Sequence, residues 1–307
     1  IFFLTHYLKD YKKDFFIFVF LLVLISPILF AYSDHPIDSN MYHHPYISYL
    51  KAEKIVLGIA NIQFRFGHVS FLQFVQAALA NDYLHSITLS SINIIIYLSF
   101  ILFASKNILT QRKLSFSFLA TILISVFILI KLARYREFGN DLIPLLLCSY
   151  FFIKILDSVN KKTYYSSNAL NVFIIFFTLM LVHKISYIFA SLIFIAFFKF
   201  KNFEFLKNLK FSYVVICSLI IFPWLLKNYL ETSCLIYPLE ITCFSNKYFY
   251  LFGLADTSSA AWLTEIWAKG FIDHPEWRSL DLREYAKGFN WVSTWMSGHF
   301  IKILEIT

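Results

Sequence analysis

The sequence has few of the residues that soluble enzymes use to bind nucleotides. Only seven of its 307 residues are glycine. It contains no glycine-rich loop of the Walker or dinucleotide-binding type, no nucleophile elbow and no histidine pair at zinc-motif spacing. Because glycine lets the backbone approach a phosphate closely, this scarcity argues against direct use of a cytoplasmic nucleotide donor.

Charged residues are also scarce. They make up 15% of the chain, whereas 59% is hydrophobic, 37 residues are phenylalanine and the mean hydropathy is +0.64. Soluble domains carry about a quarter charged residues, so the composition predicts an integral membrane protein. The net charge of +8 lies largely in short loops between apolar runs, which indicates membrane topology rather than a nucleic-acid partner.

Apolar segments predict about seven membrane spans. They cover residues 15–32, 87–105, 116–133, 142–156 and 211–226, with a further stretch at 169–198. That stretch is interrupted at His183 and Lys184, so it forms either one overlong helix or two short ones. Basic residues flank it on both sides, which places both flanks in the cytoplasm and requires an even number of crossings. We therefore predict two short helices that turn at His183 and Lys184.

The same charge rule predicts a cytoplasmic N-terminus, an external loop at 33–86 and an external C-terminal region. We expect a transmembrane domain at 1–230 and a small external helical region at 231–307 that is rich in tryptophan. Residues 41–54 and 69–84 are predicted as helices lying along the membrane surface. Because the chain begins with Ile1 rather than Met, we expect it to be a fragment of a longer protein.

Unusual polar clusters all fall on the predicted external side, at residues 34–70, 134–141, 183–184 and 227–243. Ionisable groups placed at a bilayer face are costly and typical of a functional site. Asp34 and Asp38 are the candidate catalytic carboxylates, since either could take a proton from a hydroxyl or hold a divalent metal. Alternatively, one of them caps a helix that begins near Ser39.

Several cations accompany these carboxylates, and a lipid-carrier phosphate is their natural ligand. The expected phosphate-binding residues are Arg65, Arg134, Arg136 and Lys184. The alternative is that these side chains extend toward lipid headgroups or pair with Glu137 and Asp141.

Histidines and cysteines complete the polar inventory. His43 and His44 are adjacent and point in different directions, so we predict no histidine metal site and favour anchoring at the interface. Cys234 and Cys243 lie outside by this topology and can form a disulfide across a short loop. Cys148 and Cys217 fall inside spans, where we expect them to pack as apolar residues.

Residues 38–43 (DSNMYH), 55–61 (IVLGIAN) and 65–67 (RFG) with Ser70 resemble the first external loop of a largely uncharacterised bacterial membrane family. That family is associated with surface polysaccharide synthesis. The segment from Cys234 to Cys243 is similar to it as well. The wider architecture resembles GT-C glycosyltransferases. The expected fold is an all-α polytopic transmembrane bundle, with interfacial helices in its first external loop and a small external helical C-terminal region.

This resemblance implies an enzyme of the bacterial inner membrane that passes a sugar from a polyprenyl-phosphate carrier to a glycan or lipid acceptor on the external face. The usual base of the class is an early acidic residue of the first loop. Asp38 matches that position best, and Asp34 is the reserve. Some members carry an adjacent acidic pair, which this chain lacks, so a divalent cation stays an open question. The expected substrate contacts are Tyr42, His43, Asn61 and Glu137.

Two other functions remain possible from the sequence. An O-antigen-type polymerase would act on lipid-pyrophosphate oligosaccharides and depend on the external arginines more than on Asp38. A transporter or flippase of lipid-linked glycans would not be an enzyme, and would place polar residues near the middle of the bilayer and show repeated halves. The clustering of polar residues at one face favours the transferase.

Overall fold

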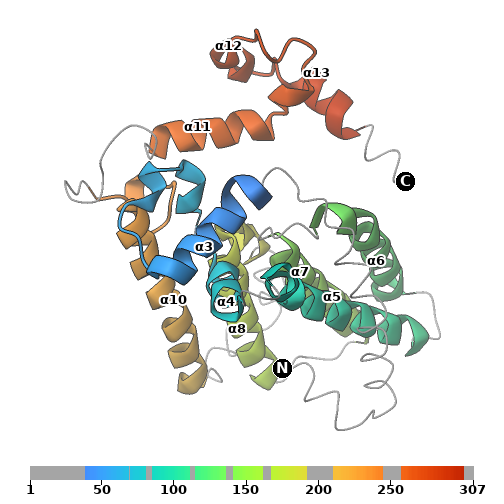
Figure 1. Ribbon diagram of the computed structural model, residues 1–307. Helices are drawn as coiled ribbons and strands as arrows, with labels where there is room; N and C mark the ends of the chain where they lie inside the picture. The colour runs from blue at the N-terminus through green and yellow to red at the C-terminus, as the bar shows by residue number, and fades with distance from the viewer. Residues whose placement is uncertain are drawn as a thin grey trace. The chain divides into compact units, whose positions relative to one another are not determined.

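The computed structural model describes residues 39–68, 70–80, 85–110, 115–135, 141–161, 167–191, 210–244 and 257–300. Within these ranges the regular elements are helical and no β-strand forms, which confirms the all-α prediction (Figure 1). The predicted first span at 15–32 lies outside the described residues. The chain divides into two compact units, of which unit 1 comprises residues 1–56 and 69–227 and unit 2 comprises 57–68 and 228–307.

Helices at the predicted spans form the core of unit 1. They are α5 (His85–Thr110), α6 (Phe116–Tyr135), α7 (Leu142–Lys161) and α8 (Ser167–His183). Helix α7 packs against α5, α6 and α8 (Figure 1). Buried Phe103, Ile128 and Ile153 lie in the apolar core that α5, α6 and α7 share. The amide of Asn107 also donates to the Thr121 hydroxyl at 2.8 Å, a polar link between neighbouring helices of the kind found in membrane bundles.

Within the part of the chain that the structure describes, two helices are long and apolar enough to cross a membrane, at Leu142–Val159 and Phe211–Thr232. Shorter apolar helices occupy Ile92–Ile108, Phe116–Leu129 and Asn171–His183. Helix α10 (Phe211–Thr232) exposes large apolar side chains, among them Phe211, Leu219 and Phe222. A contiguous exposed apolar surface of this kind suits contact with lipid, so length, composition and exposure together indicate membrane association.

The chain breaks after His183, as the sequence predicts. Helix α8 ends there, Lys184 is extended at φ −154° and ψ 110°, and a 3₁₀ turn η4 (Ile185–Phe189) follows. The alternative of one overlong helix is therefore wrong. The second half of the predicted pair, beyond residue 191, lies outside the described residues.

The first loop contributes two short helices to unit 1. A π-helical turn η1 (Ser39–His43) leads into α3 (His44–Glu53), which packs against α4 (Phe71–Leu79). A capping box begins α4: the Ser70 hydroxyl accepts from the Leu72 amide, and the Gln73 side chain accepts from the Ser70 amide. Leu72 is buried whereas Leu79 is 48% exposed, so only some of the apolar side chains of α4 pack inward.

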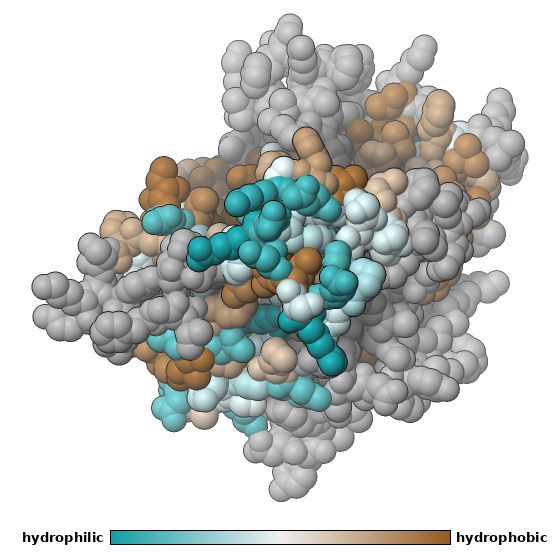
Figure 2. All heavy atoms as spheres, turned by 90° about the horizontal axis from the view of Figure 1, so that it is seen from above, coloured by the Kyte–Doolittle hydropathy of each residue, from teal (hydrophilic) through white to brown (hydrophobic). Residues whose placement is uncertain are grey.

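Unit 2 combines residues 57–68 with the C-terminal region. Its elements are η2 (Ile59–Asn61), η3 (Phe64–Gly67), η7 (Glu240–Thr242), α11 (Thr257–Ala268), η8 (Phe271–Asp273), α12 (Leu282–Ala286), α13 (Val292–Trp295) and η9 (Met296–Phe300). The Gly58 amide donates to the Leu230 carbonyl at 3.0 Å. Residues 57–68, which fall within the domain predicted at 1–230, therefore belong to the same unit as residues 228–307. Arg283, Glu284 and Lys287 of this unit are exposed. Figure 2 shows hydrophilic residues gathered on the face of the molecule that is seen from above.

A disulfide closes the segment that follows α10. Cys234 and Cys243 are bonded, which confirms the predicted pairing. Tyr237 and Phe64 pack against the bridge. Gly67 lies directly under Tyr237: a Cβ at this position would be 2.6 Å from a carbon of the Tyr237 ring. The RFG segment thus ends in glycine because no side chain fits there.

We expect Gly67→Ala to destabilise unit 2 by about 1–3 kcal/mol, because forcing a methyl group into a packed site displaces its neighbours. Thermal unfolding of the purified protein in detergent would measure the change. Ile62→Ala, at a side chain that is 61% exposed, is the matched control and should have little effect. Equal melting temperatures for Gly67→Ala and the parent protein would contradict this packing account.

Candidate functional site

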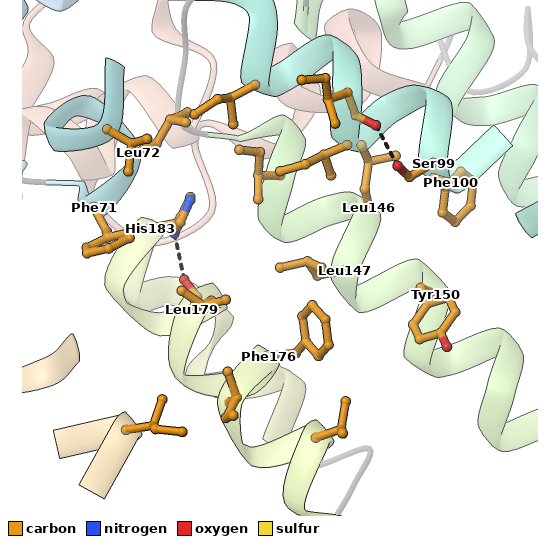
Figure 3. A pocket seen from close by; sticks show the side chains of 18 of the residues that line it. Phe71, Leu72, Ser99, Phe100, Leu146, Leu147, Tyr150, Phe176, Leu179 and His183 are labelled. Carbon is orange, nitrogen blue, oxygen red and sulfur yellow. Dashed lines mark hydrogen bonds between the residues drawn. The ribbon is translucent and has the colours of Figure 1, made fainter. Parts of the chain in front are cut away.

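An apolar cavity of about 540 Å³ lies within unit 1. Helices α4, α5, α7, α8 and α10 all contribute to its wall (Figure 3). Its lining is mainly aliphatic and aromatic: Phe71, Leu72, Val75, Ile92, Ile96, Phe100, Ile143, Leu146, Leu147, Val172, Phe176 and Leu179 are among the residues. An apolar wall with few polar groups suits a hydrocarbon ligand.

His183 brings a polar ring to this apolar wall. The residue is 8% exposed, and its Nδ1 lies 2.7 Å from the Leu179 carbonyl oxygen (Figure 3). Because a carbonyl oxygen can only accept, Nδ1 carries the proton and Nε2 is left as a hydrogen-bond acceptor. The ring of Phe71 lies beside the imidazole, with ring centroids 6.2 Å apart. This contact brings α4 of the first loop to the end of α8.

A second cavity, of about 530 Å³, adjoins the break after α8. Asp141, Cys148, Lys184, Ser186 and Tyr187 are among its lining residues. The Lys184 amine donates to the Asp141 carboxylate, and the two side chains are 44% and 46% exposed. The wall of this cavity is therefore charged, in contrast to that of the first.

The two cavities use neighbouring residues of the same two segments. Leu147 and His183 line the apolar cavity, whereas Cys148 and Lys184 line the charged one. A ligand whose hydrocarbon chain fills the apolar cavity therefore has the Lys184 amine and the Asp141 carboxylate nearby.

The predicted phosphate-binding residues have different surroundings. Lys184 pairs with Asp141 in unit 1, whereas Arg65 belongs to unit 2. The Arg65 guanidinium carbon lies 5.6 Å from the Phe64 ring centroid and 5.7 Å from that of Trp267. These are cation–π distances, so packing against aromatic rings already accounts for Arg65.

Other predicted site residues lie outside what the structure describes. Asp34, Asp38, Arg136 and Glu137 fall in undescribed segments. Arg134 lies in the last turn of α6, but its side chain is outside the described part. The catalytic role of Asp38, with Asp34 in reserve, stays a prediction.

The predicted substrate contacts near the first loop have structural partners. His43 is buried, with its Nδ1 3.3 Å from the Gln73 amide nitrogen and its ring 4.1 Å from that of Tyr42. The Asn61 amide donates to the Gly58 carbonyl at 2.9 Å. These contacts hold η1 against α4 and close the turn at η2, while contact with substrate stays a prediction for all three residues. Among the described residues, no three metal-ligating side chains gather in one place.

The structure realises the alternative expected for Lys184, because its amine donates to the Asp141 carboxylate across 43 positions. The cavity role of His183 was not foreseen, since the sequence placed this residue only in a turn. The available signal was a histidine that interrupts an otherwise apolar run.

Residues 2–306 match the family model described as a domain of unknown function, DUF8201. The chain belongs to the DUF8201 family. Both cavities of this DUF8201 chain therefore lie within the family domain, which spans both units except for residues 1 and 307. No curated protein and no solved structure matches the chain.

We expect Lys184→Met and Asp141→Asn to leave the stability of the DUF8201 protein nearly unchanged. An ion pair between partly exposed side chains contributes only about 0–1 kcal/mol, so neither change should move the melting temperature in detergent by more than a few degrees. A loss of several kcal/mol in either variant would show that the pair supports the fold and is not free to exchange partners.

Proposed function

We propose that this chain is a polytopic glycosyltransferase of the bacterial inner membrane, acting in cell-surface glycan synthesis. It would take a sugar from a polyprenyl-phosphate carrier and pass it to an acceptor at the external face. The observation that carries the proposal is an apolar cavity lined by His183, next to a charged cavity lined by the Lys184–Asp141 pair. An apolar chamber next to a cation matches a lipid chain that ends in a phosphate.

The apolar cavity supplies affinity for the carrier chain. Each methylene group that leaves water for an apolar site contributes about 0.8 kcal/mol, so even a part of a prenyl chain in this cavity would bind appreciably. Phe100, Leu146 and Phe176 offer the hydrocarbon surface for this contact.

Lys184 supplies the charge for the carrier phosphate. Its amine now donates to the Asp141 carboxylate, and a phosphate oxygen is a competing acceptor of the same kind. As the sugar departs, negative charge grows on that phosphate, and a cation held in place stabilises it. Arg134 and Arg136 would add to this effect if their side chains reach the same cavity.

The topology of the proposal has about seven spans, a cytoplasmic N-terminus and an external active face. The contact between Phe71 of the first loop and His183 at the end of α8 supports a shared face for these two segments. Asp38 directly precedes η1, which leads into the α3–α4 pair, and α4 lines the apolar cavity. This chain order favours Asp38 as the base near the carrier head.

In the proposed reaction, the Asp38 carboxylate takes the proton from an acceptor hydroxyl. The acceptor oxygen then bonds to the anomeric carbon of the sugar. The bond between that carbon and the carrier phosphate breaks, and its electron pair leaves with the phosphate oxygen. Lys184 holds the released lipid phosphate.

We expect Asp38→Asn to lower sugar transfer by at least about a hundredfold, because general-base catalysis contributes about 10²–10⁴. Transfer from a polyprenyl-phosphate sugar to membrane acceptors, followed by mass spectrometry of the products, would measure this. Asp34→Asn is the matched control and should retain most of the activity. Full activity of Asp38→Asn would exclude it as the base, and movement of the lipid without a new glycosidic bond would favour a flippase.

We expect Lys184→Met to weaken binding of polyprenyl phosphate about three- to tenfold and to leave binding of the uncharged polyprenol unchanged. Asp141→Asn should strengthen phosphate binding, since it removes the competing carboxylate. Titration of both lipids against the protein in nanodiscs would measure these affinities. Equal losses for the phosphate and the alcohol in Lys184→Met would show that the lysine acts on the fold or the chain and not on the phosphate.

A further inference from the structure

The imidazole of His183 has one nitrogen with a partner and one without. Nδ1 donates to the Leu179 carbonyl, and the ring contacts Phe71. Within the described residues, Nε2 has no hydrogen-bond donor, although the residue is 8% exposed and lines the apolar cavity. Figure 3 shows the bonded nitrogen directed along α8 and the ring among the apolar lining side chains.

Most of the wall around the imidazole is aliphatic or aromatic, and Leu179, Phe176 and Leu72 are among the lining residues. A ligand in this cavity therefore meets few polar groups besides His183. A ligand hydroxyl can donate to Nε2, and a hydrogen bond between two polar groups in an apolar site is favourable because neither group is then left unpaired.

The position of the nitrogen also orients a ligand. His183 is the last residue of α8, directly before Lys184, which lines the charged cavity. The head of a lipid therefore belongs at the His183 end, and its chain belongs along α7 and α8, where Leu146, Leu147 and Phe176 line the wall.

We propose that His183 is a binding residue whose Nε2 accepts a hydrogen bond from a hydroxyl group at the head of a prenyl lipid whose chain fills the apolar cavity. The choice of a prenyl lipid rests on the proposed function, in which the hydroxyl belongs to the carried sugar. The hydrogen bond selects a hydroxylated head over one that cannot donate, so His183 contributes specificity, whereas the cavity wall contributes affinity for the chain.

The test compares farnesol with farnesyl methyl ether, two prenyl lipids that differ in the donor hydroxyl. Binding of each is titrated against the intact protein in nanodiscs, by competition with a fluorescent fatty-acid probe. The ether is the more apolar ligand, so simple partition into the membrane or the cavity favours it. We expect the parent protein to bind farnesol about five- to tenfold more tightly, as one net hydrogen bond provides.

Three variants assign the preference to one atom. His183→Asn keeps an amide donor for the Leu179 carbonyl but removes the acceptor at the ε position, so its preference should fall below about twofold. His183→Gln places an amide oxygen near that position and should retain part of the preference. Ile96→Val trims the apolar wall and should weaken both ligands alike.

Equal binding of the two ligands by the parent protein would overturn the proposal. This comparison uses only the parent protein, so it does not depend on whether a variant folds. A preference that persists in His183→Asn would also overturn it. Discrimination that depends on His183, in a protein without sugar-transfer activity, would support this inference and reject the proposed function. Sugar transfer by a protein that binds farnesol and its methyl ether equally would support the proposed function and reject this inference.

Discussion

The extended backbone at Lys184 is the constraint on which the site depends. It ends α8 at His183, and the Lys184 amide still donates to the Met180 carbonyl at 3.0 Å. Because the helix ends at His183 and Lys184 is extended, the Lys184 side chain does not continue the helical spacing. His183 lines an apolar cavity, and Lys184 lines a charged one. If the helix continued through this point, the side chains of His183 and Lys184 would keep the regular spacing of one helix and would not line two different cavities.

The first loop depends on this break for part of its packing. Helix α4 begins at a capping box, which satisfies the Ser70 and Leu72 amides locally. Its first turn can then bury Leu72 and place Phe71 against the His183 ring. Lys227 of α10 secures the same region, since its amine donates to the Lys54 carbonyl and lies 4.7 Å from the Phe74 ring centroid. Loop, bundle and α10 thus meet around one cavity.

Features of local origin could be predicted from the sequence. Hydropathy located α5, α6, α7 and α10, and the interruption of an apolar run located the break after His183. The short spacing of two cysteines on the predicted external side gave the Cys234–Cys243 bond. Contacts between distant segments leave no such local signal. The sequence could name Asp141 as one of two partners for the cations but could not choose Lys184 for it, and the stacking of Arg65 near Trp267 was not foreseen. Both contacts depend on how helices pack, which hydropathy does not encode.

Unit 2 joins two segments that lie far apart in the sequence, and this determines the order in which the protein assembles. Residues 57–68 are made early, but the Gly58 amide bonds to the Leu230 carbonyl, and Gly67 packs under Tyr237. Those partners are synthesised only after most of the intervening bundle. Contacts of such long range form slowly because a large loop must close before they contribute. The early segment must therefore wait, open to other contacts, until the end of α10 arrives, and the bundle of unit 1 can form before unit 2 is complete.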